Sequence, residues 1–211
     1  LIMTHSDDNG LILPPKLAPY QVVIVPIYKG QEQLDEISVV AEKLMQELRD
    51  NGVTVKYDNR DTHKPGWKFN QYELQGVPVR IAIGPKDLEK GTVEVARRDT
   101  LTKSFMDQSE VSTAIPVLLD EIQVELFEKA LKFRDDHSQT VDTWEEFEIL
   151  MKNNPGFVHA HWDGTQETED KIKELTKATI RCIPLNNKLE EGKCILTGQP
   201  SIQRVVFAKA Y

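Results

Sequence analysis

The feature that most constrains the fold is an apolar run followed directly by an amphipathic segment. Residues 21–27, Gln-Val-Val-Ile-Val-Pro-Ile, form a short continuous apolar run, which is typical of a strand buried on both faces of a sheet. Apolar residues then recur at spacings of three and four from residue 34 to residue 48, which predicts one buried face of a helix. Asn51-Gly52 predicts the end of that helix. This succession indicates a layered α/β domain.

The same succession of strands and helices continues to about residue 112. Three further strands are predicted, at residues 53–57, 77–83 and 92–98. A shorter helix is predicted from Pro65 to Leu74, and residues 89–91 are predicted to form a turn. We therefore predict an α/β domain over residues 19–112, with a mixed, mostly parallel sheet layered with helices.

A long helix and a second, smaller α/β unit are predicted to follow. Pro116 predicts the start of the helix within a connecting segment of residues 113–142. One side of this helix carries five apolar residues, Leu118, Ile122, Leu126, Ala130 and Phe133. The second unit, residues 143–211, repeats the alternation, with helices near 144–151 and 167–175 and strands near 156–162, 178–185 and 204–211.

Charge and cysteine content exclude some classes of protein. The net charge of −8 argues against a protein that wraps nucleic acid without selectivity. Residues 53–103 nevertheless hold 10 Lys/Arg and 7 Asp/Glu, so a local basic face could dock a polyanion, although ordinary scatter over a solvated surface explains the same count. Two cysteines cannot form a disulfide framework, so a reducing cytoplasm is expected. No apolar run is long enough to span a bilayer, and we expect no membrane or DNA partner.

Two clusters of polar and aromatic residues are candidates for binding. The first, residues 58–69, follows a strand and contains Arg60, Lys68 and two aromatic residues, Trp67 and Phe69. Such a loop could hold phosphates and stack on unpaired bases, or its aromatic rings could simply fill the core. Composition does not separate these alternatives.

The second cluster combines two carboxylates with two cations. It comprises Glu73, Arg80, Lys86 and Asp87. A carboxylate suits guanine, because its oxygens can accept hydrogen bonds from N1–H and the exocyclic amino group of the base, and an arginine can stack on a base or hold its phosphate. The alternative is a set of solvated charges around a turn.

A metal site and a complete active site are not indicated. His159 and His161 alternate on one face of a predicted strand, with Cys182 and Cys194 downstream, but structural zinc needs four well-spaced ligands. A small metalloenzyme built on these residues would also lack an acid–base partner. The sequence contains no Gly-rich phosphate loop, no G-x-S-x-G and no H-E-x-x-H motif.

Four stretches of sequence carry a resemblance to a known family. They are residues 5–27; the segment 58–88, with Arg60-Asp61, Pro65-Gly66-Trp67-Lys68-Phe69, Glu73-Leu74, Gly76-Val77-Pro78-Val79-Arg80 and Ile83-Gly84-Pro85-Lys86-Asp87-Leu88; Arg97-Arg98-Asp99-Thr100; and the final Val205-Val206-Phe207-Ala208-Lys209-Ala210-Tyr211. Over essentially its whole length the chain resembles prolyl-tRNA synthetases of the archaeal and eukaryotic-like type. The resemblance implies the class II synthetase anticodon-binding fold, with a mixed, mostly parallel five-stranded sheet, for residues 19–112.

The resemblance also implies what the other segments are. Residues 1–18 correspond to the tail of a class II catalytic domain and a linker, residues 113–142 to a connecting helix, and residues 143–211 to the family's C-terminal domain. The ATP-binding arginine of the third class II motif falls upstream of Leu1, so this fragment is expected to be unable to activate proline. The intact enzyme would be a homodimer that joins proline to tRNA(Pro) using ATP and magnesium.

Site residues follow from the same resemblance. Residues 69–87 match the part of the family that reads the two guanines ending the proline anticodon. We assign guanine recognition to Glu73 and Asp87 and stacking or phosphate contact to Phe69, Arg80 and Lys86, with Arg60 and Lys68 as neighbours. In the intact enzyme Tyr211 and its carboxylate would turn toward the active site.

The resemblance further bears on zinc, which many relatives hold with four cysteines. The four ligand positions fall here on Trp162, Glu167, Cys194 and Thr197, so one cysteine of four remains and we predict no zinc. Cys182 matches a family cysteine that is not a ligand. The alternative to a synthetase part is a stand-alone RNA- or protein-binding module with the same fold, although such a module would not need residues 1–18.

Overall fold

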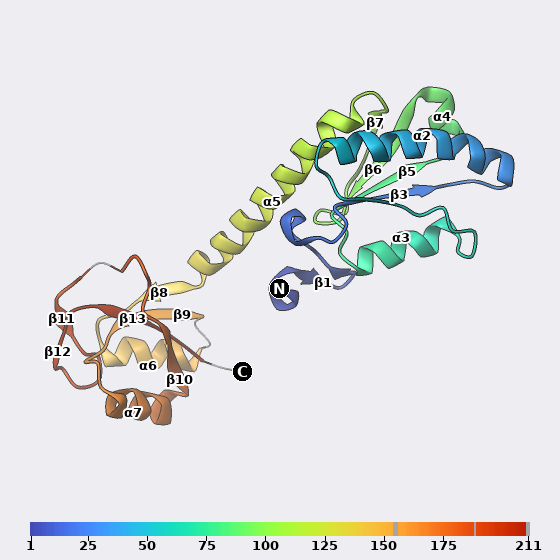
Figure 1. The fold of residues 1–211 in the computed structure, drawn as a ribbon. Coiled ribbons are helices and arrows are strands. Elements are labelled where there is room, and N and C mark those ends of the chain that lie inside the picture. The colour runs from blue at the N-terminus through green and yellow to red at the C-terminus, as the bar shows by residue number, and fades with distance from the viewer. Residues whose placement is uncertain (154–155, 188, 210–211) are drawn as a thin grey trace. The chain divides into compact units, whose positions relative to one another are not determined.

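The computed structural model describes residues 1–153, 156–187 and 189–209. The chain divides into two compact units, residues 1–129 and residues 130 onward (Figure 1). Each unit has its own sheet and its own hydrophobic core. Among the residues that the structure describes, no helix is long and apolar enough to cross a membrane.

The first unit is built on a mixed five-stranded sheet. Its strands are β3 (Val22–Pro26), β4 (Val55–Tyr57), β5 (Val79–Ile83), β6 (Thr92–Arg97) and β7 (Lys103–Asp107), and their order in the sheet is β4-β3-β5-β6-β7. β3 pairs in parallel with β4 and β5, whereas β6 runs antiparallel to both of its neighbours. The predicted mixed α/β fold, with most strands pointing the same way, is confirmed.

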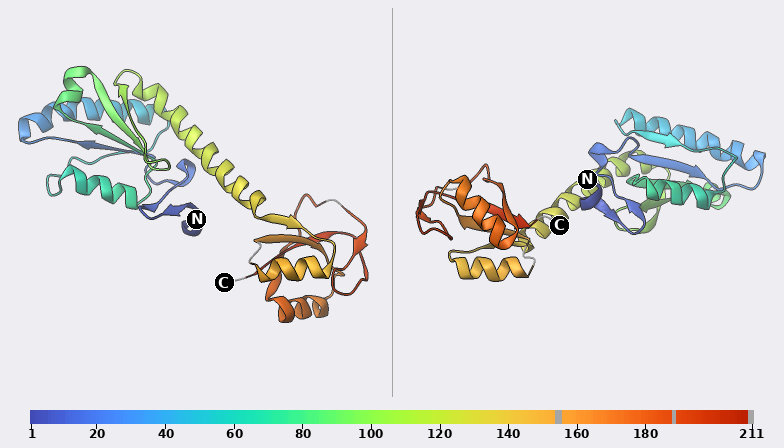
Figure 2. Two further views of the ribbon diagram at one scale, coloured as in Figure 1. Left: turned by 180° about the vertical axis from the view of Figure 1, so that it is seen from behind. Right: turned by 90° about the horizontal axis from the view of Figure 1, so that it is seen from below.

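Helices cover both faces of this sheet, and every residue of β3 and β5 is therefore buried. Val22 and Ile24 face α2 (Gln31–Asp50) and α5 (Val111–Asp136). Val23 and Val25 face the opposite side, where they pack with Tyr72 of α3 (Pro65–Leu74). Figures 1 and 2 show α2 and α3 on opposite faces of the strands. The period-two alternation of β3 therefore separates a large core from a small one.

Three sequence-based expectations for this unit were wrong in detail. A turn was predicted at residues 89–91, but residues 89 and 90 belong to helix α4 (Pro85–Lys90). Gly91, at φ +67°, ends this helix. β7 was not predicted, because four of its five residues are exposed and show no apolar alternation. α5 begins at Val111 and not at Pro116, since Val111 and Ile115 are buried in the core.

The buried face of α5 also differs from the predicted one. Its buried residues are Val111, Ile115, Leu119, Ile122 and Leu126, whereas Phe133 is 62% exposed. The helix ends at Asp136, and residues 138–140 form strand β8 (Ser138–Thr140), which pairs with the second sheet. The predicted connecting segment, residues 113–142, thus contains both a helix and a strand.

One buried guanidinium links residues 1–18 to the rest of the first unit. This segment forms α1 (Ile2–His5), β1 (Ser6–Asp7), β2 (Gly10–Leu11) and the short 3-10 helix η1 (Pro15–Leu17). Arg98 is 3% exposed and donates hydrogen bonds to both carboxylate oxygens of Asp7, at 2.9 and 2.6 Å. It also donates to the carbonyl oxygens of Gly10, at 3.0 Å, and Glu73, at 2.9 Å. Arg98 therefore links the N-terminal hairpin to the end of α3.

The second unit is a four-stranded sheet with two helices. The sheet order is β10 (Ala178–Cys182), β13 (Arg204–Lys209), β9 (Phe157–His161) and β8, with only β8 and β9 parallel. α6 (Trp144–Lys152) contributes Phe147 and Met151 to the core, and α7 (Gln166–Thr176) contributes Ile172. Along the chain, the segment that connects β10 to β13 forms a separate two-stranded hairpin, β11 (Gly192–Lys193) and β12 (Pro200–Ser201). Tyr211 lies outside the described residues.

The Asp7–Arg98 contact predicts a pH-dependent stability. The hydrogen bonds from Arg98 lower the pKa of Asp7 to about 2, from an ordinary 3.8. The ionised carboxylate therefore stabilises the fold above about pH 4, and this stability is lost as the pH falls toward 2. Asp7→Asn should lower the free energy of unfolding by about 1–2 kcal/mol at pH 7, with the difference vanishing near pH 2. Urea unfolding of both proteins across this pH range measures it.

Asp8→Asn is the matched control, because Asp8 has no side-chain hydrogen bond or ion pair within the described residues. It should leave the urea midpoint unchanged at every pH. Equal behaviour of the two variants would contradict the role given to Asp7.

Candidate nucleic-acid interface

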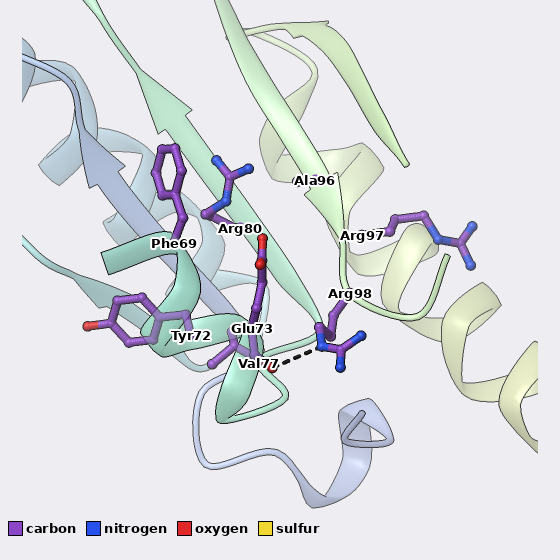
Figure 3. A pocket seen from close by; sticks show the side chains of 8 residues that line it. All are labelled: Phe69, Tyr72, Glu73, Val77, Arg80, Ala96, Arg97 and Arg98. Carbon is purple, nitrogen blue, oxygen red and sulfur yellow. Dashed lines mark hydrogen bonds between the residues drawn. The ribbon is translucent and has the colours of Figure 1, made fainter. Parts of the chain in front are cut away.

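Arg80 lies in a small hollow between α3, β5 and β6, which we call the first hollow. The hollow is lined by Phe69, Tyr72, Glu73, Val77, Arg80, Ala96, Arg97 and Arg98 (Figure 3). Arg80 is 5% exposed, and its guanidinium stacks on the Phe69 ring with 3.7 Å from the guanidinium carbon to the ring centroid. Nη1 of Arg80 donates to Glu94 at 3.1 Å. Among the described residues, Nε and Nη2 of Arg80 have no hydrogen-bond partner.

These two nitrogen atoms make the hollow a candidate binding site. A buried N–H group without a partner costs about 1–3 kcal/mol, so folded proteins rarely retain one. Figure 3 shows the Glu73 carboxylate pointing to the same side as the Arg80 guanidinium, whereas Arg97 points away from both. The free volume is only about 20 Å³, which suits the edge of a planar group or a water molecule. The hollow thus presents donors and an acceptor side by side.

A second hollow lies where β3 and β5 end. It is lined by Ile27, Tyr28, Lys29, Gln33, Gly84, Pro85, Lys86 and Asp87, with a volume of about 390 Å³. The carboxyl ends of neighbouring parallel strands are where α/β sheets usually bind ligands. Asp87 Oδ2 accepts a hydrogen bond from the Gly84 N–H at 2.8 Å, which orients the carboxylate, and Lys86 is exposed beside it. This hollow thus has one carboxylate, Asp87, and two cations, Lys29 and Lys86.

A buried carboxylate, Asp58, positions the loop before α3. Arg60 donates to both of its oxygens, at 2.7 Å each, and Tyr72 donates its hydroxyl to Oδ2 at 2.9 Å. Lys68 Nζ lies 3.7 Å from Oδ1 and donates to the carbonyl oxygens of Asp58, at 2.9 Å, and Arg60, at 2.6 Å. Asp58 follows β4 directly, so these bonds attach α3 to the edge of the sheet.

Charges inside this cluster shift one another's pKa values. Burial alone would raise the pKa of Asp58, but hydrogen bonds from Arg60 and Tyr72 and the charge of Lys68 lower it well below its ordinary value. Burial lowers the pKa of Lys68, against the attraction of Asp58. Burial and the hydrogen bond to Asp58 raise the pKa of Tyr72 to about 12. At neutral pH the cluster therefore contains an ionised carboxylate held by two cations and a neutral phenol.

The structure divides the residues predicted for the site into three groups. Phe69, Glu73 and Arg80 share the first hollow, and Lys86 and Asp87 share the second. Arg60 lies on the loop before α3, with its side chain 42% exposed.

Lys68 is the exception among the predicted contacts. It is 1% exposed and its ammonium is used inside the protein, so its position suits loop support and not contact with RNA. We reassign it accordingly. Sequence reasoning also missed Glu94, because only the register of β6 against β5 brings it beside Arg80.

The residues at the four zinc-ligand positions do not fit zinc. Cys194 is buried, but Thr197 Oγ1 donates to Asp163 Oδ2 at 2.8 Å, Glu167 is exposed on α7, and Trp162 offers no ligand atom. Over residues 1–153, 156–187 and 189–209, no group of three or more His, Cys, Asp or Glu side chains could hold a metal. His159 and His161 belong to no such group, and His161 Nδ1 lies 3.1 Å from Ser201 Oγ.

Asp163 provides a different link between the same two segments. Its Oδ2 accepts from Thr197 and Thr168, both at 2.8 Å, and its Oδ1 accepts from the Thr165 hydroxyl at 2.9 Å. These hydrogen bonds lower the pKa of Asp163, against the effect of burial. A carboxylate and three threonine hydroxyls thus join the start of α7 to the turn after Cys194.

The role of Lys68 predicts a large loss of stability on its replacement. Lys68→Met should lower the free energy of unfolding by about 3 kcal/mol, because it leaves two carbonyl oxygens without their donor and removes one of the two cations beside the buried Asp58 carboxylate. Lys64→Met, the same change four residues earlier on an exposed side chain, should change it by less than about 0.5 kcal/mol. Urea unfolding compares the two variants, and similar losses would contradict the assignment.

If hydrogen bonds to Asp163, and not a metal, join these two segments, two results should follow. Thr197→Val should lower the free energy of unfolding by about 1 kcal/mol, because Asp163 loses one hydrogen bond. Thr140→Val is the control, since the exposed Thr140 has no side-chain hydrogen bond among the described residues. A metal chelator should leave the Tm of the unmodified chain unchanged. A drop in Tm on chelation would show that this unit does hold a metal.

Comparisons with known proteins find matches for both units of the chain. Residues 21–118 match a family model described as an anticodon binding domain, and residues 144–211 match one described as the C-terminal domain of prolyl-tRNA synthetase. Similar relatives are the proline–tRNA ligases of Christiangramia forsetii, 65% identical, and of Porphyromonas gingivalis and Flavobacterium psychrophilum, each 59% identical. Each alignment covers the whole of this chain and 43% of the relative, so the chain spans less than half the length of these curated relatives. The chain therefore carries an anticodon-binding domain, followed by a domain that matches the C-terminal domain of prolyl-tRNA synthetase.

Proposed function

We propose that the first unit reads the anticodon of tRNA(Pro) as part of a proline–tRNA ligase. The observation that carries this proposal is the buried Arg80, whose Nε and Nη2 have no partner in the described part of the chain and lie beside the Glu73 carboxylate. The relatives named above support the parent activity, which is the ATP-dependent attachment of proline to tRNA. We place ATP and magnesium binding, and the contacts of a homodimer, in the longer protein and outside the residues described here.

An unpaired guanine matches the groups in the first hollow. Its Watson–Crick edge presents the O6 acceptor next to the N1–H and N2–H₂ donors, so Arg80 can donate to O6 while Glu73 accepts from the two donors. Adenine presents an amino donor where guanine has O6, so it would face the Arg80 donors with another donor. Phe69 holds the guanidinium plane in place by stacking.

The second hollow repeats this combination for a second base. Asp87 supplies the acceptor and Lys86 the cation, at the ends of strands β3 and β5. Two hollows, each with a carboxylate beside cationic side chains, match an anticodon that ends in two guanines. We assign Arg60 to a phosphate near these bases, because its side chain is partly exposed and its guanidinium is fixed by Asp58. Charged tRNA is used in translation, so we propose that the protein works in the cytoplasm.

The test compares the binding of two tRNA(Pro) transcripts to the 211-residue chain at one stated salt concentration. One transcript carries the UGG anticodon and the other has both guanines replaced. We expect at least tenfold tighter binding of UGG, which is about 1.4 kcal/mol. Glu73→Gln combined with Asp87→Asn should abolish this preference, because each amide replaces one acceptor oxygen with a donor.

Glu73→Gln and Asp87→Asn are chosen because an amide has nearly the shape of a carboxylate, so the fold around each position should be kept. Asn at position 87 retains one oxygen that can accept from the Gly84 N–H. Glu89→Gln, on the exposed surface of α4, changes the charge next to the second hollow without lining it, and it should retain the full preference. Equal binding of both transcripts by the unmodified chain would contradict the assignment of these residues.

A further inference from the structure

The outer face of α3 carries a third hollow that the proposed function does not use. It is lined by Trp67, Asn70, Gln71, Leu74 and Gln75 and has a volume of about 230 Å³. Trp67 is 47% exposed and Leu74 is 57% exposed. We call this surface the outer face of α3. Large exposed apolar side chains that gather around one hollow commonly mark a binding surface.

The Trp67 ring is held in position by contacts with its neighbours. It stacks on the His63 ring, with 3.6 Å between ring centroids and 24° between the ring planes. The Arg60 guanidinium carbon lies 5.9 Å from the Trp67 centroid. Arg60 is itself fixed by Asp58 and donates to Gln71 Oε1 at 3.1 Å. A ring that is already ordered loses little side-chain entropy when a second flat group stacks on it.

The charge near this face suits an anionic partner. The two cations Arg60 and Lys68 surround the single carboxylate of Asp58, so the cluster beneath Trp67 has one positive charge in excess. Lys64 and Asp61, both exposed on the same loop, cancel each other. A positive charge next to an exposed indole is the usual combination in proteins that bind single-stranded nucleic acid.

The side chains around the hollow favour a nucleobase over an apolar peptide. Asn70, Gln71 and Gln75 carry amides, each of which can donate and accept hydrogen bonds to the edge of a heterocycle. Only Trp67 and Leu74 offer apolar area, which is little for a protein interface. An unpaired base that stacks on the indole and meets the amides at its edge uses every group present.

The outer face is continuous with the proposed anticodon site, because both lie on α3. At 3.6 residues per turn, Phe69 and Glu73 point toward β5, whereas Trp67 and Leu74 point about 100–160° away around the helix. Asn70 lies between these two directions. A strand of RNA with one guanine in the first hollow can therefore follow α3 past Asn70 to Trp67.

We propose that Trp67 stacks on an unpaired base of the anticodon loop, adjacent to the two guanines. This proposal rests on the proposed function, since it requires that the guanines bind where we place them. His63 and Arg60 keep the indole oriented, and the base stacks on the exposed part of the ring. The contact adds affinity without selecting one base, because every base has a flat face that can stack.

Binding of a tRNA(Pro) anticodon stem-loop to the 211-residue chain tests the proposal. Trp67→Ala should weaken binding about tenfold, which equals about 1.4 kcal/mol and lies in the range for one base stacked on an aromatic ring. Trp67→Phe, which keeps a ring, should weaken it less than threefold. Leu175→Ala, on an exposed position of the second unit, is the control and should bind as the unmodified chain does.

Stem-loops that lack one base identify the stacked nucleotide. One abasic site replaces the base on the 5′ side of the guanines, and another replaces the base on the 3′ side. With one of these two RNAs, Trp67→Ala and the unmodified chain should bind equally, because the stacking partner is gone. In a variant with Trp144→Phe and Trp162→Phe, the emission of Trp67 should be quenched by the intact RNA and not by that abasic RNA.

The outcomes separate this proposal from the proposed function. If Trp67→Ala binds as tightly as the unmodified chain while the guanine preference persists, the stacking proposal is overturned and the anticodon site stands. If the tenfold loss persists with both abasic RNAs, Trp67 acts through the fold and the proposal is also overturned. If the unmodified chain shows no guanine preference, the proposed function itself fails.

Discussion

The buried carboxylate of Asp58 is the group on which the RNA-facing surface depends. It ends β4, and it orders the side chains of Arg60, Lys68 and Tyr72 around two oxygen atoms. A charge with no exposed surface is tolerated only when it is fully paired, so this arrangement resists local change. Because Lys68 and Tyr72 belong to α3, the pairing of Asp58 also fixes the helix that supplies Phe69, Glu73 and Trp67.

β5 adds a second constraint, since it is buried along its whole length and yet carries an arginine. Arg80 reaches the face of the sheet that α3 covers only in part, where Phe69 and Glu94 hold its guanidinium. The buried charged side chains in the described part of the first unit, Asp58, Lys68, Arg80 and Arg98, all contact α3 or line the hollow beside it. The polar groups therefore gather on the α3 side, where the cost of an unpaired guanidinium nitrogen can be recovered by a ligand.

Elements whose burial follows a simple period could be predicted from the sequence, and those set by tertiary contacts could not. β3 and α2 were predicted within a few residues, because a continuous apolar run and a three-four spacing each fit one structure. β7 shows no such period, since pairing with β6 alone makes it a strand. Glu73 and Arg80 were candidates from their chemistry and the family resemblance. Lysine is seldom buried, so nothing in the sequence indicated that Lys68 lies inside the protein.

The ten residues of α3 have three separate tasks on three faces of the helix. Lys68 and Tyr72 face the sheet and bind Asp58, Phe69 and Glu73 face Arg80, and Trp67 faces outward. Helical geometry keeps these directions about 100–140° apart, so the side chains on each face make their own contacts. Loss of stability, loss of guanine preference and loss of base-independent affinity should therefore arise from different residues of one helix. A helix that served only to cover the sheet would need neither the second face nor the third.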